Sequence, residues 1–232
     1  MSELNIRCFT VGAFQVNTYL IQDPQSGQCA LIDTGESDEL PEALARLQPD
    51  LRYILLTHAH FDHAGALVAL QRLFPAAVTC LPALERPLFE ALPRQGEWFG
   101  MPPFNRPCGR IDRELHDGDT VQLGHTTLHF ISTPGHTPGQ GCYYTDRDIF
   151  VGDTLFAGSV GRTDFPMSDP ALAERSLLKL MELPGQLRVH CGHGPDTTLE
   201  RELRNNPFLA HVRRARGLAE PAAAVPGVLR WR

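Results

Sequence analysis

The sequence lacks the features that mark exported and membrane-spanning proteins. Its N-terminal stretch, MSELNIRCFTVG, contains no basic segment followed by an apolar one, so we expect no signal peptide. No apolar run approaches the roughly 20 residues that a transmembrane helix needs. The six cysteines form no CxxC pair, and their irregular spacing predicts reduced, mostly buried thiols. We therefore expect a cytoplasmic protein with no membrane partner.

Positive charge is scarce, and a serine-nucleophile motif is missing. The chain of 232 residues carries 21 Lys and Arg against 27 Asp and Glu, a formal net charge of −6. Because phosphate binding usually needs a basic surface, we expect no nucleic-acid partner. The closest imitation of a G-x-S-x-G motif is GSVGR at 158–162, which lacks the pattern. Nothing in the sequence indicates an oligomeric state.

Strand-like and helix-like segments follow one another in two clusters. Alternating apolar residues predict strands within 6–34 and again between 119 and 153, and helical spacing predicts helices that follow each set. The predicted helices are 37–47, 64–74, 171–183 and 198–209. Residues 92–110, rich in Pro, Gly and aromatics, are predicted to form a long loop or insertion. This order fits two face-to-face sheets with helices outside, or a three-layer α/β fold with one sheet.

The stretch THAHFDHAG, at 57–65, concentrates metal-binding side chains after a buried strand. In an extended backbone, His58 and His60 point to the same side. Asp62 and His63 come at the start of the following helix and are expected to point back into the same space. These donors exceed what one tetrahedral zinc ion needs, which suggests two metals.

Three more donors stand just past predicted strands, where an active site collects residues from separate connections. His136 lies in PGHTPGQ, Asp153 follows IFVG, and His193 lies in HCGHG. We predict one metal centre made of these three and the four donors of the first stretch. Cys191 could touch a metal or pack in the core, and the other histidines are expected on the surface or on strands: His116, His125, His129 and His211.

The order HxHxDH, then His, Asp and His, resembles that of the metallo-β-lactamase fold superfamily. The resemblance implies a four-layer αββα sandwich with the metal site at one edge of the two sheets. It covers about residues 6–209, so we expect a hydrolase domain at 1–209 and a loosely held tail at 210–232.

The same resemblance implies a division of the donors between two divalent ions. His58, His60 and His136 would hold the first metal, and Asp62, His63 and His193 the second. Asp153 and a hydroxide would bridge them, and Asp62 could also orient that hydroxide. Asp33, in the IDTG turn, resembles a buried aspartate that orients a metal ligand by hydrogen bonding. Zinc is expected, although His and carboxylate ligands also accept iron or manganese.

Two further segments, LFAGSVGRTDFP at 155–166 and ERELRNNPFL at 200–209, are similar to the short bacterial branch of the glyoxalase II family. That similarity implies hydrolysis of S-2-hydroxyacylglutathione thioesters, typically S-D-lactoylglutathione. Arg162 would hold a carboxylate of the thiol carrier, and Phe165 would wall the acyl pocket. The alternative is that Arg162 pairs with Asp164 in its own turn. The C-terminal extension with which longer glyoxalase II enzymes hold glutathione has no evident counterpart here.

Other chemistries of the superfamily remain open. The GRTDF run is shared with persulfide dioxygenases, which hold one iron with two histidines and an aspartate, here His58, His136 and Asp153. Two further alternatives for the function are a hydrolase of lactones or other esters and a binding protein without catalysis. A β-lactam substrate is less expected, because class B β-lactamases usually carry cysteine at the position of Asp153.

Overall fold

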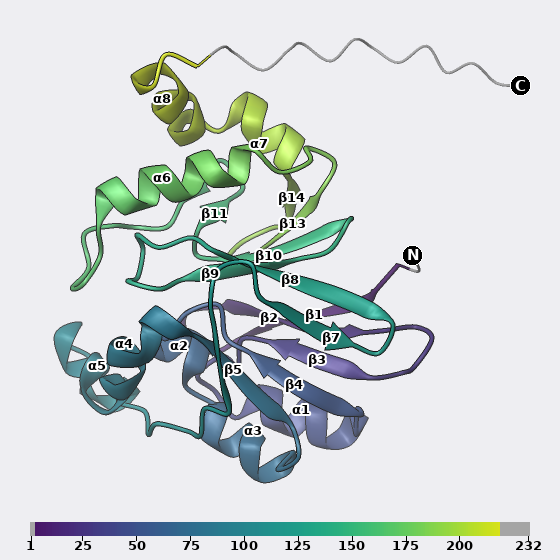
Figure 1. The fold of residues 1–232 in the computed structure, drawn as a ribbon. Coiled ribbons are helices and arrows are strands. Elements are labelled where there is room, and N and C mark those ends of the chain that lie inside the picture. Colours follow the sequence, from purple (N-terminus) through teal and green to yellow (C-terminus); the bar gives the residue numbers. More distant parts are fainter. Residues whose placement is uncertain (1–2, 219–232) are drawn as a thin grey trace, which may run out of the picture.

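The fold is built from two β-sheets that pack face to face, with helices on both outer sides (Figure 1). The structure is a computed structural model that describes residues 3–218. In the first sheet the six strands follow chain order. They are β1 (Asn5–Val11), β2 (Val16–Gln22), β3 (Cys29–Ile32), β4 (Leu51–Leu55), β5 (Val78–Pro82) and β6 (Arg113–Leu115).

The second sheet has the strand order β14-β13-β10-β9-β8-β7, and β11 and β12 form a separate short hairpin after β10. Its strands are β7 (Thr120–Leu123), β8 (Thr126–Ser132), β9 (Gly141–Tyr144), β10 (Asp148–Gly152), β13 (Arg188–Cys191) and β14 (Thr197–Thr198). The hairpin consists of β11 (Leu155–Phe156) and β12 (Ser159–Val160).

The helices form the two outer layers (Figure 1). The first sheet is covered by α1 (Glu39–Leu47), α2 (Phe61–Ala64), α3 (Leu67–Leu73), η1 (Ala83–Glu85), α4 (Arg86–Glu90), α5 (Leu92–Trp98) and η2 (Pro102–Phe104). The second sheet is covered by α6 (Pro170–Met181), α7 (Leu199–Asn205) and α8 (Pro207–Ala215). Within residues 3–218, no helix combines the length and apolar character that crossing a bilayer requires.

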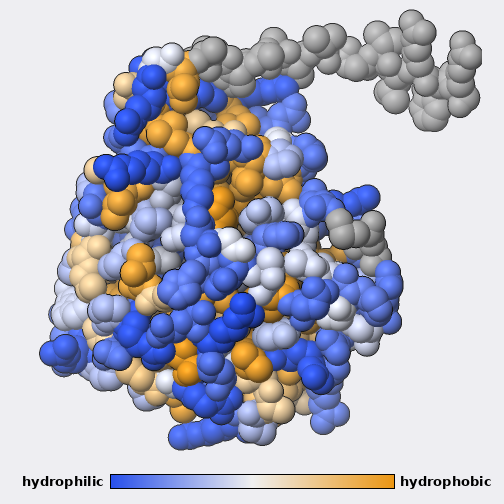
Figure 2. Space-filling model, in the orientation of Figure 1, coloured by the Kyte–Doolittle hydropathy of each residue, from blue (hydrophilic) through white to orange (hydrophobic). Residues whose placement is uncertain are grey.

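Buried side chains on alternate faces of the strands explain why four layers form. In β3, Leu31 packs against the outer helices, whereas Ala30 and Ile32 pack against the second sheet. In β10, Phe150 faces the first sheet and Val151 faces the α6 side. Strands that are apolar on both faces must be covered on both sides. The αββα sandwich predicted from the sequence is therefore confirmed. On the face in Figure 2, hydrophilic residues surround small hydrophobic patches.

The structure corrects the loop predicted at 92–110. Residues 92–98 form α5 and residues 102–104 form η2. Pro93 is the second residue of α5, and Pro102 and Pro103 are the first two of η2; at such positions the missing N–H is no loss and the fixed φ favours a helical start. Proline therefore begins short helices here, in a segment whose proline content had indicated a loop.

The domain boundary expected at residue 209 falls inside α8. The predicted helix 198–209 is two helices, because Pro207 starts a new helix that Asn206 caps. That second helix continues to Ala215, and Val212 and Arg213 are buried. The first residues of the expected tail thus belong to the domain, and residues 219–232 lie outside the described residues. All six cysteines are free thiols, and four of them are buried.

Candidate metal centre

The seven predicted donors come together at one end of the two sheets. His58 and His60 follow β4, and His136 lies between β8 and β9. Asp153 follows β10, and His193 follows β13. Asp62 and His63 lie on α2. Their ligand atoms form three groups in which all atoms lie within 4.8 Å of one another: His58, His60 and His136; His58, His63 and Asp153; Asp62, His63 and His193.

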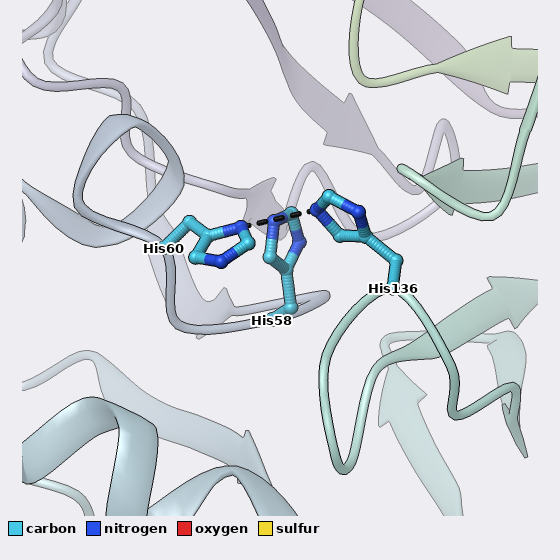
Figure 3. Close-up of side chains that lie close together, drawn as sticks. All are labelled: His58, His60 and His136. Atoms are coloured by element: carbon cyan, nitrogen blue, oxygen red, sulfur yellow. Dashed lines mark hydrogen bonds between the residues drawn. The ribbon is translucent and has the colours of Figure 1, made fainter. Parts of the chain in front are cut away.

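The first group contains three imidazoles from two loops (Figure 3). The Nδ1 atom of His60 lies 3.0 Å from Nε2 of His136. The ring centroid of His58 lies 5.0 Å from that of His60 and 5.1 Å from that of His136. Because His58 and His60 come from the first sheet and His136 from the second, only the packing of the two sheets creates this group.

The second group lies beside the first, and Asp153 stands between them. The Nε2 atoms of His63 and His193 are 3.3 Å apart, and Oδ2 of Asp62 is 3.5 Å from Nε2 of His193. One Asp153 oxygen lies 3.3 Å from Nε2 of His63. Its other oxygen lies 3.6 Å from Nε2 of both His136 and His193. This is the arrangement that a bridging carboxylate requires.

Asp33 fixes two of the donors from behind. Its Oδ1 accepts a hydrogen bond from the Thr57 N–H at 2.7 Å, and its Oδ2 accepts one from the Thr57 hydroxyl at 2.7 Å. Nδ1 of His63 lies 2.9 Å from the same Oδ2, and Nδ1 of His58 lies 3.1 Å from the Thr57 hydroxyl. The acceptors keep the ring protons on the outer nitrogens, so each Nε2 is free to face the centre.

Backbone carbonyls orient two further rings in the same way. Nδ1 of His136 donates to the carbonyl of Arg162 at 2.7 Å, and Nδ1 of His193 donates to the carbonyl of Phe14 at 3.1 Å. The GRTDF segment at 161–165 thus supports the metal centre through the backbone carbonyl of Arg162. The roles predicted for this segment involved only the side chains of Arg162 and Phe165. Asn17, in β2, donates from Nδ2 to the carbonyl of Cys191 at the end of β13 and to that of Gly194 just after it, which holds the loop that carries His193.

Electrostatics in the centre favour neutral imidazoles in the first group. Burial, followed by the neighbouring imidazoles, lowers the pKa of His58 well below its ordinary value. Burial and the nearby His136 lower the pKa of His60 to about 3. Both rings are therefore neutral at pH 7, which metal ligation requires.

Negative charge dominates around the second group. Burial opposes protonation of His63, yet Asp153, Asp62 and Asp33 raise its pKa well above the ordinary value. Burial likewise opposes ionisation of Asp153, and the imidazole of His63 above all lowers its pKa. A site that stabilises positive charge on a buried ring is a site in which a cation is favourable.

The residues present fit a metal centre on chemical grounds. His58 Nε2 and Asp153 Oδ1 are buried and have no hydrogen-bond partner among the described residues. Buried polar atoms are nearly always satisfied, so two such atoms facing one space indicate a ligand that accepts their lone pairs. Gly192 preserves that space, because a Cβ there would lie 2.4 Å from Oδ1 of Asp153 and 2.8 Å from Cε1 of His63.

An aromatic cavity of about 560 Å³ opens in front of the donors. The ring of Phe165 lies 5.8 Å from that of His60 and 5.2 Å from that of Phe99, and Phe165 lines the cavity. The other non-donor residues lining it are Phe14, Phe61, Met101, Phe156 and Arg162.

Arg162 is engaged within its own turn. Its guanidinium makes two hydrogen bonds to Asp164, at 2.9 and 2.7 Å, and lies 4.4 Å from the centroid of Phe165. This is the alternative pairing considered above. Both partners are exposed, so the pair can be opened by a competing carboxylate at little cost.

Three buried polar residues behind the centre were missed from the sequence. Glu85 and Gln95 lie in short helices of the first sheet's outer layer, and both are fully buried. Glu202 accepts from the Gly158 N–H and from the Thr197 hydroxyl, which ties α7 to the β11–β12 hairpin. A charged residue on the apolar side of a predicted helix was a signal for Glu202. No such signal existed for Glu85 and Gln95.

The remaining histidine and cysteine near the centre have other partners. His190 lies between Asp148 and Asp196, at 2.9 and 2.7 Å from their carboxylates. Cys191 belongs to none of the three donor groups found among residues 3–218 and packs in the core beneath α6. Burial raises the pKa of the Cys191 thiol to about 12, so the thiol stays protonated in the core.

Comparison with known proteins agrees with this geometry. The model of the metallo-beta-lactamase superfamily matches residues 11–193. The hydroxyacylglutathione hydrolase GloC of Haemophilus influenzae is 36% identical over 210 residues, which are 89% of this chain and 98% of that protein.

Two solved structures share the fold over most of the chain. BLEG-1, a B3 metallo-beta-lactamase, is 34% identical with a TM-score of 0.80, over 88% of this chain and 99% of that one. TTHA1623, in a di-iron-bound form, is 36% identical with a TM-score of 0.77, over 88% of this chain and 100% of that one. The resemblance predicted from the sequence is confirmed: the chain belongs to the metallo-beta-lactamase superfamily and is a metallo-hydrolase.

Proposed function

We propose that the protein hydrolyses S-D-lactoylglutathione or related S-2-hydroxyacyl thioesters to the hydroxy acid and the free thiol. The observation that carries the proposal is the pair of donor groups joined by Asp153 at the floor of an open cavity. The similarity over nearly its full length to a protein named hydroxyacylglutathione hydrolase supports the thioester. The substrate is thus a small molecule, and we propose a cytoplasmic location.

Two divalent ions are part of the proposal. His58, His60 and His136 would hold one ion, and Asp62, His63 and His193 the other, with Asp153 shared. The di-iron form of TTHA1623 supports a pair, and zinc, iron or manganese would each suit these ligands. When bound, such ions lower the pKa of water towards neutrality and polarise the carbonyl that is attacked.

The chain's own residues orient the reaction. Asp62 would accept a hydrogen bond from the attacking water and so direct its lone pair at the carbonyl carbon. The rings stay fixed because Asp33 and backbone carbonyls hold their outer nitrogens. A leaving thiol has a pKa of about 8.5, so it departs as the thiolate without a strong general acid, which an amide would need.

Elemental analysis of the purified protein beside a thiol-release assay tests the proposal. Two metal ions per chain and rapid thiol release from S-D-lactoylglutathione are expected. One iron per chain with oxygen uptake on a persulfide would instead favour the dioxygenase. Faster turnover of a lactone or a β-lactam than of any thioester would make the thioester assignment wrong.

A further inference from the structure

The backbone between the donors His58 and His60 is not held by the hydrogen bonds of a helix or a strand. Residues 56–60 belong to no helix or strand. The N–H of Ala59, between His58 and His60, donates to Oε2 of Glu85 at 2.8 Å. The carbonyl of Ala59 accepts from Nε2 of Gln95 at 2.8 Å. Both polar groups of this buried peptide segment are thus satisfied by side chains from elsewhere in the chain.

Gln95 extends the same support to the next residue between donors. The N–H of Phe61, between His60 and Asp62, donates to Oε1 of Gln95 at 2.9 Å. Nε2 of Gln95 also donates to the carbonyl of Leu88 in α4 at 2.8 Å. The amide can point in only one direction, because one end meets an N–H and the other meets two carbonyls. The Gln95 amide therefore anchors the donor loop to the helical layer beside the carboxylate of Glu85.

Glu85 reaches the second sheet as well. Its Oε1 accepts from the N–H of Gly139 at 2.6 Å, in the loop that carries His136. A Cβ on Gly139 would lie 2.6 Å from the backbone nitrogen of Glu85, so the two segments are in direct contact. One carboxylate consequently joins the loops whose His60 and His136 rings meet at 3.0 Å.

We propose that Glu85 and Gln95 are positioning residues of the metal centre. They set the backbone path through His58 and His60, and Glu85 sets the distance from this loop to His136. The group formed by His58, His60 and His136 depends on them. The second group has its own supports, since Asp33 holds His63 and the Phe14 carbonyl holds His193. The proposal rests on metal binding by these donors, as proposed above.

The environment of Glu85 agrees with a role other than stabilising the fold. Burial raises its pKa to about 7, despite the backbone N–H groups that hydrogen-bond to it. A buried carboxyl with a raised pKa is unfavourable for folding compared with an apolar side chain of similar size. Its hydrogen bonds end on two donor loops, where they control geometry.

Glu85→Gln is the sharpest test, because it keeps the volume and turns one acceptor into a donor. One backbone N–H would then face an amide NH₂. Loss of such an orienting contact typically weakens metal affinity about 10–100-fold. We expect this loss in one binding step only, with the other step unchanged. The readout is metal retained per chain when the loaded full-length protein is dialysed against graded chelator, with the absorption of bound Co²⁺ reporting the ligand geometry.

Asp23→Asn is the matched control. Asp23 is also a fully buried carboxylate that accepts backbone N–H bonds, from Gln25 and Ser26, and it ties the turn after β2 to Thr126 of the second sheet. It does so at the end of β2 opposite to the donors. We expect lower stability but unchanged metal retention.

Two outcomes would overturn the proposal. Either Glu85→Gln retains metal like the unmodified protein, or Asp23→Asn loses as much. If Glu85→Gln does not fold, Gln95→Met tests the same claim, since it removes all three bonds of the amide and is expected to weaken the same step. Metal retention is measured without substrate, so a failure of thioester hydrolysis in the unmodified protein would count against the proposed function alone.

Discussion

Individual residues decide where each proton lies in the metal centre. The outer nitrogens of His63, His136 and His193 each face an acceptor, which directs the inner nitrogens at the centre. His58 and Asp153 each keep a buried atom without a hydrogen-bond partner among the described residues. The side chains are therefore arranged for a cation before one binds.

Replacing a central donor should stop the reaction. We expect His58→Ala, His60→Ala or Asp153→Ala to abolish turnover and to lower the metal content, because each removes an atom from the donor groups. Steady-state kinetics and elemental analysis measure both effects. His129→Ala is the control, since His129 stacks on Tyr144 in the second sheet and belongs to none of the donor groups found among residues 3–218. Equal losses in the control would disprove a specific role of the donors.

Arg162 and Asp164 can be separated by opposite effects on KM. If Arg162 holds a substrate carboxylate, Arg162→Ala raises KM about tenfold, equivalent to about 1.4 kcal/mol of binding. Asp164→Asn removes the competing carboxylate and should leave KM unchanged or lower it. Both are measured with S-D-lactoylglutathione. An unchanged KM in Arg162→Ala would refute the proposed contact.

His190 should make the stability depend on pH. Burial by itself lowers the pKa of His190, but hydrogen bonds to Asp148 and Asp196 raise it above its ordinary value of about 6.5. Because the pKa is higher in the folded state, protonation of His190 stabilises the fold. This stabilisation is complete below the ordinary, unfolded-state pKa and is lost as the pH rises through the folded-state pKa. The Tm advantage over His190→Gln should therefore shrink above about pH 6.5. A difference that stays constant from pH 5 to 9 would contradict this account.

At the scale of elements, capped helix starts connect the C-terminal helices to the site. Asn206 is fully buried, and its side-chain oxygen accepts the N–H groups of Phe208 and Leu209 at the start of α8. Its Nδ2 donates to the carbonyls of Phe156 and Ser159 in the β11–β12 hairpin. Asn206, between α7 and α8, thus anchors the hairpin, which lies between Asp153 and Arg162 in the chain.

Two N-caps of different surroundings should differ in their contribution to stability. Asp169→Ala removes the cap of α6, whose contacts are solvent-exposed, and should cost about 1 kcal/mol. Asn206→Ala also leaves buried carbonyls without a donor, so we expect a loss of roughly 2–4 kcal/mol. Chemical denaturation of both variants measures the free energy of unfolding. Equal losses would show that the hairpin contacts of Asn206 contribute nothing.

At the scale of the whole molecule, the metal centre lies where both sheets meet, so metal binding should stabilise the entire sandwich. Ions bound only by the folded chain add about 4 kcal/mol when free metal exceeds Kd by about 1,000-fold. Chelation should therefore lower Tm, and metal should restore it. Asp153→Ala should respond less, because it lacks the shared carboxylate. Identical unfolding curves with and without chelator would argue against a stabilising centre.

The layers of the molecule were partly predictable. Apolar alternation in strands such as β3 and β10 reflects local burial, so the strands could be recognised from the sequence. Whether they formed one sheet or two depends on which faces meet, and periodicity does not carry that information. The helices at 92–98 and 102–104 were missed because proline signals both a loop and a helix start.

The sequence by itself was enough to select the seven residues that the structure brings together, because metal chemistry restricts donors to a few residue types and these stand just past strands. It could not determine their supports, since any buried polar residue can meet any neighbour. Only the tertiary structure brought Glu85 and Gln95 to the backbone around Ala59, and the Arg162 carbonyl to His136. Those contacts join segments far apart in the chain, and their distances exist only once the two sheets have packed.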